Sequence, residues 1–464
     1  MTPEQIVGLG PALVEFLRSL RACFTECRLL DHLGVYCRGL LSNLERKSVE
    51  PIALAAGGTV RALQLFLTHH VWDHQRLRDL LQQRVARLHA PPPGQSRCAA
   101  DPGVIGLIDE TSVVKKGIYT PGVQRQYCGT VGKVENGIVT VHLGYCHGDF
   151  KALLDSDLFL PKSWSEDRER CRQADIPDDV VYRPKTDIAI AQVRHALGNG
   201  LKFDWITFDE GYGKSPAFLF DLDALGQTWI GEVPKSFRCW PTLPQHHSPR
   251  QEFASKEVCN VVRWSPAFIY QDWQSFTIAR ETVEPVVWDV KAAQVHLAQD
   301  GYPTDRTYWL IVAWNRRTDE YKYFLSNAPP TTALELLLRV AFRRAKIEHL
   351  FRLAKDQVGL DHFEGRSYVG LMRHMILCQT VLLFVAEQTG RLNAEAEQTG
   401  RLNAEMAAPA PPPAHATRGE KKHARPDPDP QAPTPGTADR HPHRAACHHG
   451  ADGRRPQLAL CPLA

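Results

Sequence analysis

Residues Val104 to Lys116 read VIGLIDETSVVKK, in which a short apolar run meets an acidic residue at Asp109. Turn-forming residues, DPG at 101–103, precede the run. A short apolar run bounded by turn residues is typical of a buried β-strand. We expect Asp109 at the exit of this strand, where a carboxylate at the edge of a core can face a metal ion or a substrate. An aspartate that only ends the strand or caps a helix gives the same local pattern, so this stretch alone leaves both interpretations open.

The same construction recurs downstream, where FDWITF at 203–208 predicts a second apolar strand and Asp209 follows it. Two such aspartates can supply two ligands of one metal site, because carboxylate oxygens suit Mg²⁺ or Mn²⁺. Two ions about 4 Å apart can activate an attacking oxygen and stabilise a leaving one. The GKS at 213–215 resembles the end of a phosphate-binding loop, but Phe208 stands where that motif needs its first glycine. ATP use is therefore not supported.

A third carboxylate lies on a long helix predicted from about Thr331 to Val358. Four charged residues recur along this helix at helical spacing and share one face: Arg344, Glu348, Arg352 and Lys355. A lone helix of this kind more often carries an ordinary salt-bridged surface. Taken with the two aspartates, however, Glu348 completes an Asp-Asp-Glu set of metal ligands, and the cations beside it become candidate phosphate ligands.

Length and composition limit the class of protein. The chain of 464 residues is long enough for two or three domains, and its composition is ordinary, with 43% hydrophobic and 23% charged residues. A net charge of +3 is too small to require a nucleic-acid partner, so any basic surface must be local. We recognise no CxxC pair, signal peptide or membrane-spanning apolar run, and therefore expect reduced thiols and a cytoplasmic protein with no membrane partner.

The regions on either side of the first aspartate differ in character. Residues 1–92 show helical periodicity, and basic residues such as Arg46 and Lys47 are compatible with docking on DNA, although a solvated helical surface fits equally well. Between the second aspartate and the Glu348 helix the sequence turns to β-type. Its strand candidates are residues 258–263, 273–280, 285–290, 307–314 and 321–325.

These motifs together resemble the bacterial insertion-sequence transposases of the DDE class, and within it insertion-sequence family 701, which carries a β insertion before the catalytic Glu. The resemblance covers about residues 30 to 390. The matching stretches, in chain order, are IDETSVVKKG, VQRQYCGTVGKVENG, FLPKSW, TFDEGYG and EHLFRLAKDQVGLDHFEGRSYVGLMRH.

The chain departs from the pattern of this class at a few positions. The class motif Tyr-x2-Arg-x3-Glu-x6-Lys is matched from Arg344 onward, but Ala341 stands at the Tyr position. Ala345 replaces a usual Trp, and VE at 283–284 replaces a usual Lys-Gly. A lost aromatic residue and a new acid near DNA would weaken binding, although neither removes a metal ligand.

The resemblance implies an α/β fold, with an RNase H-like mixed sheet and helices, interrupted by a β-rich insertion and preceded by a small helical domain. The expected segments are 1–92 (helical, DNA-binding), 93–222 (first catalytic part), 223–330 (β insertion), 331–385 (helix with Glu348 and the next helix) and 386–464 (tail). It also implies that Asp109 and Asp209, on strands, and Glu348, on a helix, bind two Mg²⁺ or Mn²⁺ ions.

The implied activity is cleavage of the ends of a DNA element and their joining to target DNA. Expected partners are double-stranded DNA and a second copy of the chain in the active complex, with the protein at the nucleoid. Residues expected to bind DNA phosphates are Arg344, Lys355, Arg352, Lys115, Lys116 and Arg125. Two alternatives stay open: a metal-dependent nuclease that cuts without joining, and a decayed DNA-binding protein of a mobile element.

The C-terminal segment is unusual. The decapeptide AEQTGRLNAE occupies 386–395 and recurs identically at 396–405, and a Pro-, His- and Arg-rich sequence follows Ala407. A perfect short copy indicates a recent duplication, and the sequence after it is predicted to be disordered. We hypothesise that this tail is out of frame and replaces a final helical segment, which favours the decayed alternative.

Overall fold

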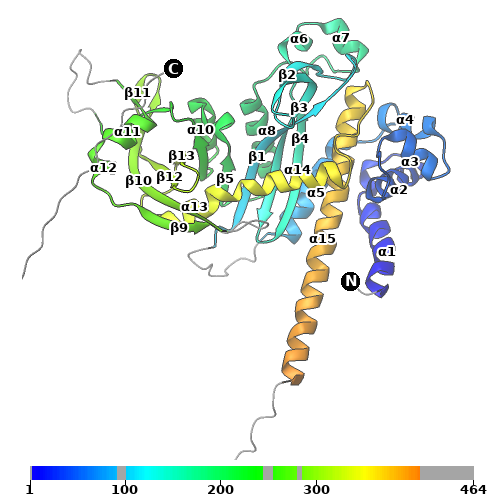
Figure 1. Ribbon diagram of the computed structural model, residues 1–464. Helices are drawn as coiled ribbons and strands as arrows, with labels where there is room; N and C mark the ends of the chain where they lie inside the picture. Colours follow the sequence, from blue (N-terminus) through cyan, green and yellow to red (C-terminus); the bar gives the residue numbers. More distant parts are fainter. Residues whose placement is uncertain (1–2, 91–100, 244–253, 279–284, 408–464) are drawn as a thin grey trace, which may run out of the picture. The chain divides into compact units, whose positions relative to one another are not determined.

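The computed structural model describes residues 3–90, 101–243, 254–278 and 285–407 (Figure 1). As expected, its N-terminal region is helical, and leucine and phenylalanine side chains on the inner faces of the helices form its core. Side chains of Thr59 and Asp73 cap two of these helices by accepting backbone N–H groups. The helices are α1 (Pro3–Ser19), η1 (Arg21–Cys23), α2 (Cys27–Leu41), α3 (Val49–Ala55), α4 (Val60–Thr68) and α5 (His74–Leu88).

The central sheet has the strand order β4-β3-β1-β5-β6. Strand β1 pairs antiparallel with β3 and parallel with β5, and β5 pairs parallel with β6. This mixed order is that of an RNase H-like sheet, and the predicted fold class is confirmed. A further strand, β2 (Gln124–Cys128), forms a hairpin with the start of β3. The central strands are β1 (Val104–Val114), β3 (Lys133–His147), β4 (Phe150–Leu158), β5 (Trp205–Phe208) and β6 (Trp229–Val233).

Helices cover this sheet and bury its apolar side chains. Helix α8 packs against β3 and β4, while α14 (Ala345–Asp356) crosses β1, β3 and β4 (Figure 1). Gln192 of α8 is buried and donates to the carbonyl of Val141 in β3 at 2.9 Å. The remaining helices of this part are α6 (Lys162–Ser165), α7 (Arg168–Gln173), α8 (Lys185–Gly198), α9 (Glu210–Gly213) and α10 (Pro216–Ala224).

The β-rich insertion continues the central sheet instead of forming a separate one, because β13 pairs antiparallel with β6. One predicted strand is wrong: residues 258–263 lie in helix α11, where Val258 and Val261 are buried at a helical spacing. Short apolar runs do not distinguish the two structures by periodicity. The elements are β7 (Arg238–Trp240), β8 (Lys256–Glu257), α11 (Val258–Trp264), α12 (Pro266–Ile269), β9 (Gln274–Ile278), β10 (Val286–Gln299), β11 (Tyr302–Pro303), β12 (Tyr308–Asn315) and β13 (Glu320–Ser326).

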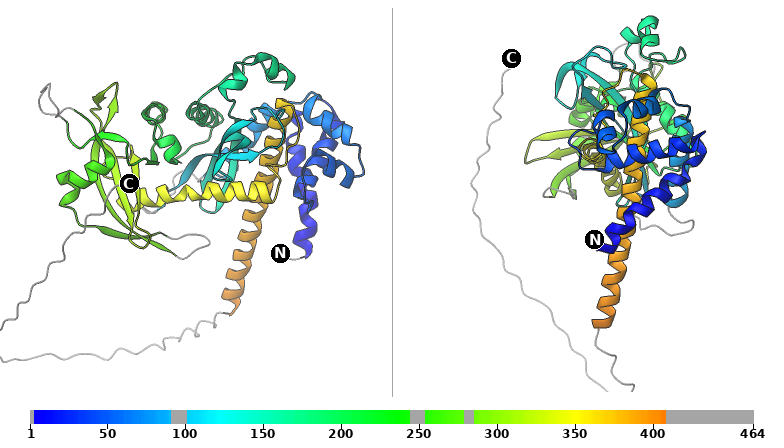
Figure 2. Two further views of the ribbon diagram at one scale, coloured as in Figure 1. Left: turned by 45° about the horizontal axis from the view of Figure 1, so that its top comes forward. Right: turned by 90° about the vertical axis from the view of Figure 1, so that its right-hand side faces the viewer.

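The long helix predicted from Thr331 consists of two helices that run in line, α13 (Leu334–Arg343) and α14, separated only by Arg344 (Figure 2). The last helix, α15 (Tyr368–Ala407), includes both copies of the duplicated decapeptide. Contrary to the sequence expectation, its segment Tyr368–Thr399 is long and apolar enough to cross a membrane. Because 78% of that apolar window is buried inside the protein, a core helix is the better explanation. The tail from residue 408 lies outside the described residues.

Candidate active site

Asp109 lies inside strand β1, not at its exit, because β1 continues to Val114. In the antiparallel register Asp109 is opposite His142 of β3, and directly opposed residues project from the same face of a sheet. The ring of His142 contacts Phe351 of α14, so this is the face that α14 covers. Asp109 is 8% exposed, and its Oδ1 accepts the backbone N–H of Glu110 at 2.7 Å. The carboxylate is therefore held in place at a nearly buried position.

Glu348 approaches Asp109 from α14, and Arg344 joins the two. Arg344 donates from Nη1 to Oδ2 of Asp109 at 2.9 Å and from Nη2 to Oε1 of Glu348 at 2.8 Å. The Glu348 side chain is 57% exposed, whereas that of Arg344 is 22% exposed. Helix periodicity explains the Arg344–Glu348 pair, since residues four apart lie one turn above each other. The pair between Arg344 and Asp109 is a long-range contact that no local pattern predicts.

Asp209 immediately follows strand β5 and caps α9 by accepting the N–H of Tyr212 at 3.3 Å. Asp209 thus has the capping role that the sequence left open for Asp109, but its charge also acts on the neighbouring site. It is one of the causes that raise the pKa of Asp109 and one of those that raise the pKa of Arg344. The parallel pairing of β1 and β5 accounts for this proximity, because it aligns the two strands side by side.

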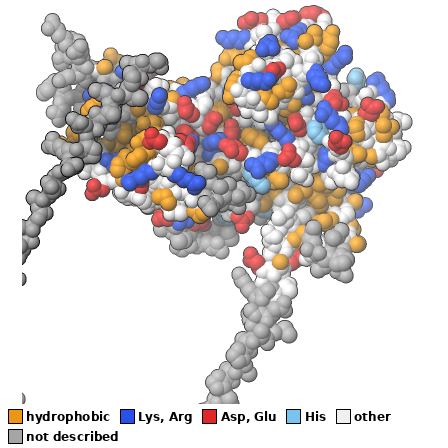
Figure 3. All heavy atoms as spheres, viewed as in Figure 1, with side chains coloured by type: hydrophobic (Ala, Val, Ile, Leu, Met, Phe, Trp, Pro, Cys, Tyr) orange, Lys and Arg blue, Asp and Glu red, His pale blue; other side chains and the backbone are white. Residues whose placement is uncertain are grey.

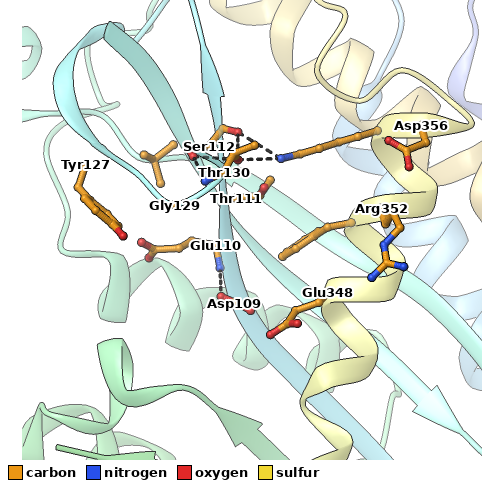
Figure 4. A pocket seen from close by; sticks show the side chains of 13 residues that line it. Asp109, Glu110, Thr111, Ser112, Tyr127, Gly129, Thr130, Glu348, Arg352 and Asp356 are labelled. Atoms are coloured by element: carbon orange, nitrogen blue, oxygen red, sulfur yellow. Dashed lines mark hydrogen bonds between the residues drawn. The ribbon is translucent and has the colours of Figure 1, made fainter. Parts of the chain in front are cut away.

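A pocket of about 350 Å³ lies between β1, the β2–β3 hairpin and α14 (Figure 4). Glu348 points from α14 toward Asp109 of β1, and both side chains line the pocket (Figure 4). Asp209 does not line it. The lining residues are Asp109, Glu110, Thr111, Ser112, Tyr127, Gly129, Thr130, Val139, Glu348, Phe351, Arg352, Lys355 and Asp356.

The electrostatics of Asp109 fit a bound cation. The pKa of Asp109 is raised to about 7, mainly by burial; Arg344 opposes this rise, and the Asp209 charge adds to it. Burial disfavours the charged form of a carboxylate and a nearby cation favours it, and hard carboxylate oxygens are the donors that Mg²⁺ and Mn²⁺ prefer. Among the residues described, no three His, Cys, Asp or Glu side chains are grouped closely enough to hold a metal ion. Arg344 already pairs with two of the three carboxylates, Asp109 and Glu348. In this arrangement the guanidinium, and not a metal ion, is the cation beside them.

Three of the six predicted phosphate-binding residues lie at this site. Arg344 contacts the carboxylates, while Arg352 and Lys355 line the pocket. Lys355 donates from Nζ to the carbonyl of Ser112 at 3.2 Å and to Oγ1 of Thr130 at 3.0 Å. Burial lowers the pKa of Lys355.

The other three predicted phosphate-binding residues do not line the pocket. Lys115 donates from Nζ to the carbonyl of Phe363 at 2.5 Å, so its ammonium group already has a partner inside the protein. Lys116, which follows β1, and Arg125, which lies on β2, are both exposed.

The basic pair near the N-terminus also has internal partners. Lys47 is 5% exposed and donates from Nζ to the carbonyls of Leu40, at 2.8 Å, and Gln357. Arg46 forms an ion pair with Glu364 at 2.6 Å. Lys47 therefore attaches the helical region to the end of α14 and is not free to contact DNA.

Sequence inspection missed a second polar cluster at the site. Glu110 accepts from Nζ of Lys185 at 2.5 Å and from the Tyr212 hydroxyl at 3.3 Å. Tyr212 is 2% exposed, and burial raises its pKa well above the ordinary value. Because the Tyr212 N–H donates to Oδ1 of Asp209 and its hydroxyl donates to Glu110, this one residue connects Asp209 to the Glu110 that follows Asp109. The motif DEGYG at 209–213 contains both Asp209 and Tyr212, so this part of the cluster is visible in the sequence. Lys185, the partner of Glu110, is distant in sequence from both.

On the face that Figure 3 shows, the Lys and Arg side chains of the described residues do not form one continuous basic surface. Lys and Arg side chains are interspersed with acidic and apolar ones across it (Figure 3). This distribution agrees with the small net charge of +3. Positive charge available for a polyanion is therefore local, and the cations of α14 contribute to it at the pocket.

A family model described as DDE superfamily endonuclease matches residues 19–295. The matched residues include Asp109 and Asp209, whereas Glu348 lies beyond them. The chain is also 30% identical over 237 residues to a protein of Microchaete diplosiphon named as a probable transposase for insertion sequence element IS701. That similarity covers 50% of this chain and 56% of the relative, so the chain spans about half of the relative's length. With its RNase H-like sheet and a family match over more than half of its residues, this chain belongs to the DDE superfamily endonucleases.

Proposed function

We propose that this protein is a DNA transposase, which cleaves the ends of an insertion sequence and joins them to target DNA. The observation that carries the proposal is the shared pocket of Asp109 and Glu348, with Asp209 within electrostatic reach, on an RNase H-like sheet. Support also comes from the similarity to a relative named as a probable transposase.

Asp109, Asp209 and Glu348 would together hold the divalent metal, as two Mg²⁺ or Mn²⁺ ions. When bound, the metal supplies an activated water or hydroxyl nucleophile and stabilises the leaving oxygen of the phosphodiester. The rigid strand β1 and the cap on α9 fix the positions of Asp109 and Asp209, while Glu348 is on the more exposed helix face. Glu348 is accordingly the ligand whose rotamer can adjust as substrate enters.

The cations of α14 would position the scissile phosphate. Arg344 and Arg352 offer planar guanidinium groups that match phosphate oxygens, and Lys355 offers a compact charge held by Ser112 and Thr130. Lys116 and Arg125 would contact phosphates farther along the strand. Such contacts make affinity fall steeply with salt and give no sequence preference by themselves.

The active complex would contain two copies of the chain, because two element ends must be brought together before joining. It would act on chromosomal DNA at the nucleoid in the cytoplasm. The helical region and the β insertion would recognise the base sequence of the element ends. Along the chain, one precedes the catalytic strand β1 and the other follows β6.

A strand-joining assay tests the proposal. A labelled duplex that ends in the element's own terminal sequence is mixed with a supercoiled target plasmid and Mg²⁺ or Mn²⁺. Transfer of the label to the plasmid supports a transposase. Nicking at the ends without transfer would favour the metal-dependent nuclease instead. Binding to the ends without any nicking would favour a decayed DNA-binding protein.

A further inference from the structure

Arg344 pairs with two of the three proposed metal ligands at once. One arm of its guanidinium reaches Oδ2 of Asp109 at 2.9 Å, and the other reaches Oε1 of Glu348 at 2.8 Å. Asp209 adds to the attraction, since its charge is among those that stabilise the Arg344 cation. A divalent ion that uses those carboxylate oxygens must compete with this cation for them.

The competing cation is held firmly, but not irreversibly. Its side chain is 22% exposed, so part of it is accessible from solvent. Arg344 is also the residue between α13 and α14, at one end of the helix that carries Glu348. A guanidinium binds phosphate with the same planar geometry that it uses for carboxylates. A DNA phosphate at the site therefore offers Arg344 an alternative partner with matching geometry.

We propose that Arg344 is an electrostatic latch, which keeps divalent metal out of the site until a DNA phosphate takes over its guanidinium. The inference rests on the proposed metal-dependent function and adds a regulatory step to it. By thermodynamic linkage, DNA must raise the affinity for metal by the same factor by which metal raises the affinity for DNA. The protein would thus assemble its reactive centre only on its substrate.

The other cations of α14 are less suited to this role. Lys355 is bound to the carbonyl of Ser112 and to Thr130, and burial disfavours its charged form. Arg352 lines the same pocket, but within the described residues it forms no ion pair with Asp109 or Glu348. Arg352 therefore offers a matched control, because its replacement removes the same charge from the pocket without opening the latch.

The test measures Mn²⁺ binding directly, from the electron paramagnetic resonance signal of free Mn²⁺. Five full-length proteins are compared, with and without a short duplex of arbitrary sequence at low salt: wild type, Arg344→Gln, Arg344→Lys, Arg352→Gln and Asp109→Ala. Phosphate contacts are independent of sequence, so the duplex need not contain the element ends. Thermal unfolding of each protein confirms that it is folded.

Without DNA, we expect Arg344→Gln to bind Mn²⁺ about ten-fold more tightly than wild type, within the usual range of coupling between two sites. Arg344→Lys should lie between them, because a single ammonium cannot hold both carboxylates as the two-armed guanidinium does. Arg352→Gln should stay close to wild type. The duplex should tighten Mn²⁺ binding to wild type by a larger factor than it does for Arg344→Gln.

Two results would overturn the latch, and they have different meanings. Equal Mn²⁺ affinity in wild type, Arg344→Gln and Arg352→Gln, with binding abolished in Asp109→Ala, would reject the latch and leave the metal site intact. Mn²⁺ binding that does not change in Asp109→Ala would reject the metal site, and the latch with it.

Discussion

The guanidinium of Arg344 donates to Oδ2 of Asp109 across 2.9 Å, and so joins the helix pair α13–α14 to the central strand β1. This one contact places the Glu348 helix over the strand that carries the first aspartate. It accompanies the meeting of Asp109 and Glu348, which are distant in sequence, at one pocket. The charged residues of the site therefore also hold two parts of the fold together. The effects of a substitution on DNA cleavage and on the stability of the fold must be measured separately.

Glu348→Gln should separate the effect on DNA cleavage from the effect on stability. The Glu348 side chain is 57% exposed, and exposed ion pairs contribute about 0–1 kcal/mol. We therefore expect the free energy of unfolding in urea to change by less than about 1 kcal/mol. DNA cleavage should be lost, because the amide is a poor metal ligand. A large loss of stability would show that Glu348 has a structural role that the pocket geometry does not indicate.

Gly213 should be intolerant of any side chain. A Cβ at this position would lie 2.0 Å from the backbone carbonyl oxygen of Glu232, and backbone cannot move aside as a side chain does. Gly213→Ala should therefore push α9 away from β6 and lower the free energy of unfolding by more than about 2 kcal/mol. It should also reduce DNA cleavage, because Asp209 is displaced. Urea unfolding of this variant is compared with that of Gly198→Ala, where a Cβ meets nothing within 4 Å. Equal stability of the two variants would contradict this prediction.

Arg373 should be important for the attachment of the helical region to α15. It is 6% exposed and donates to the carbonyls of Phe66 at 3.3 Å, Leu67 at 3.1 Å and Trp72 at 2.9 Å. Arg373→Gln should lower the free energy of unfolding by about 2–4 kcal/mol, because buried carbonyl groups lose a charged hydrogen-bond donor.

The control for this variant lies on the same helix. Arg391 forms only an exposed ion pair with Glu395, so Arg391→Gln should change stability by less than about 0.5 kcal/mol. Limited proteolysis between α5 and β1 reports separately on whether the helical region has detached. A protease pattern for Arg373→Gln that matches wild type would contradict the proposed role of Arg373.

His374 should make the protein less stable in acid. Burial lowers its pKa to about 4, and its ring bonds the Tyr36 hydroxyl at 2.9 Å and the Gly359 carbonyl at 3.0 Å. Between the ordinary pKa of 6.5 and about 4, the unfolded chain binds a proton that the folded protein does not. Stability from this residue is thus complete above pH 6.5 and falls as the pH is lowered, by up to about 1.4 kcal/mol per pH unit.

The matching measurement is the difference in unfolding free energy between wild type and His374→Gln, followed from pH 7 to pH 4. That difference should shrink as the pH falls, because glutamine does not titrate. Buried carboxylates act in the opposite direction, as burial raises the pKa of Asp155 to about 6, but they are common to both proteins and cancel. A difference that stays constant over this range would contradict the account of His374.

Much of the fold could be predicted from local patterns. The apolar runs before Asp109 and Asp209 are strands, and the Glu348 face is helical, because periodicity reports burial directly. Patterns failed where long-range contacts decide the outcome. Strand β1 extends past Asp109 because pairing with β3 continues to Val114.

The same reason explains why the sequence could not show which cations have partners inside the protein. Arg46 and Lys47 look like a DNA-binding pair in sequence, yet their partners Glu364 and Gln357 lie far along the chain. Lys115, which the sequence predicts to bind a phosphate, donates to the carbonyl of Phe363 in this structure. A sequence shows that a residue is charged, but only the fold shows whether its charge is already paired.

The most direct test of the central claim is metal-dependent cleavage of a DNA that carries the element's own ends, with wild type, Asp109→Asn and Glu348→Gln in parallel. We expect wild type to nick at the ends only with Mg²⁺ or Mn²⁺, and both folded variants to lose cleavage while still binding DNA. Cleavage that survives in either variant, or that proceeds without divalent metal, would contradict the assignment of Asp109, Asp209 and Glu348 as the metal-binding centre.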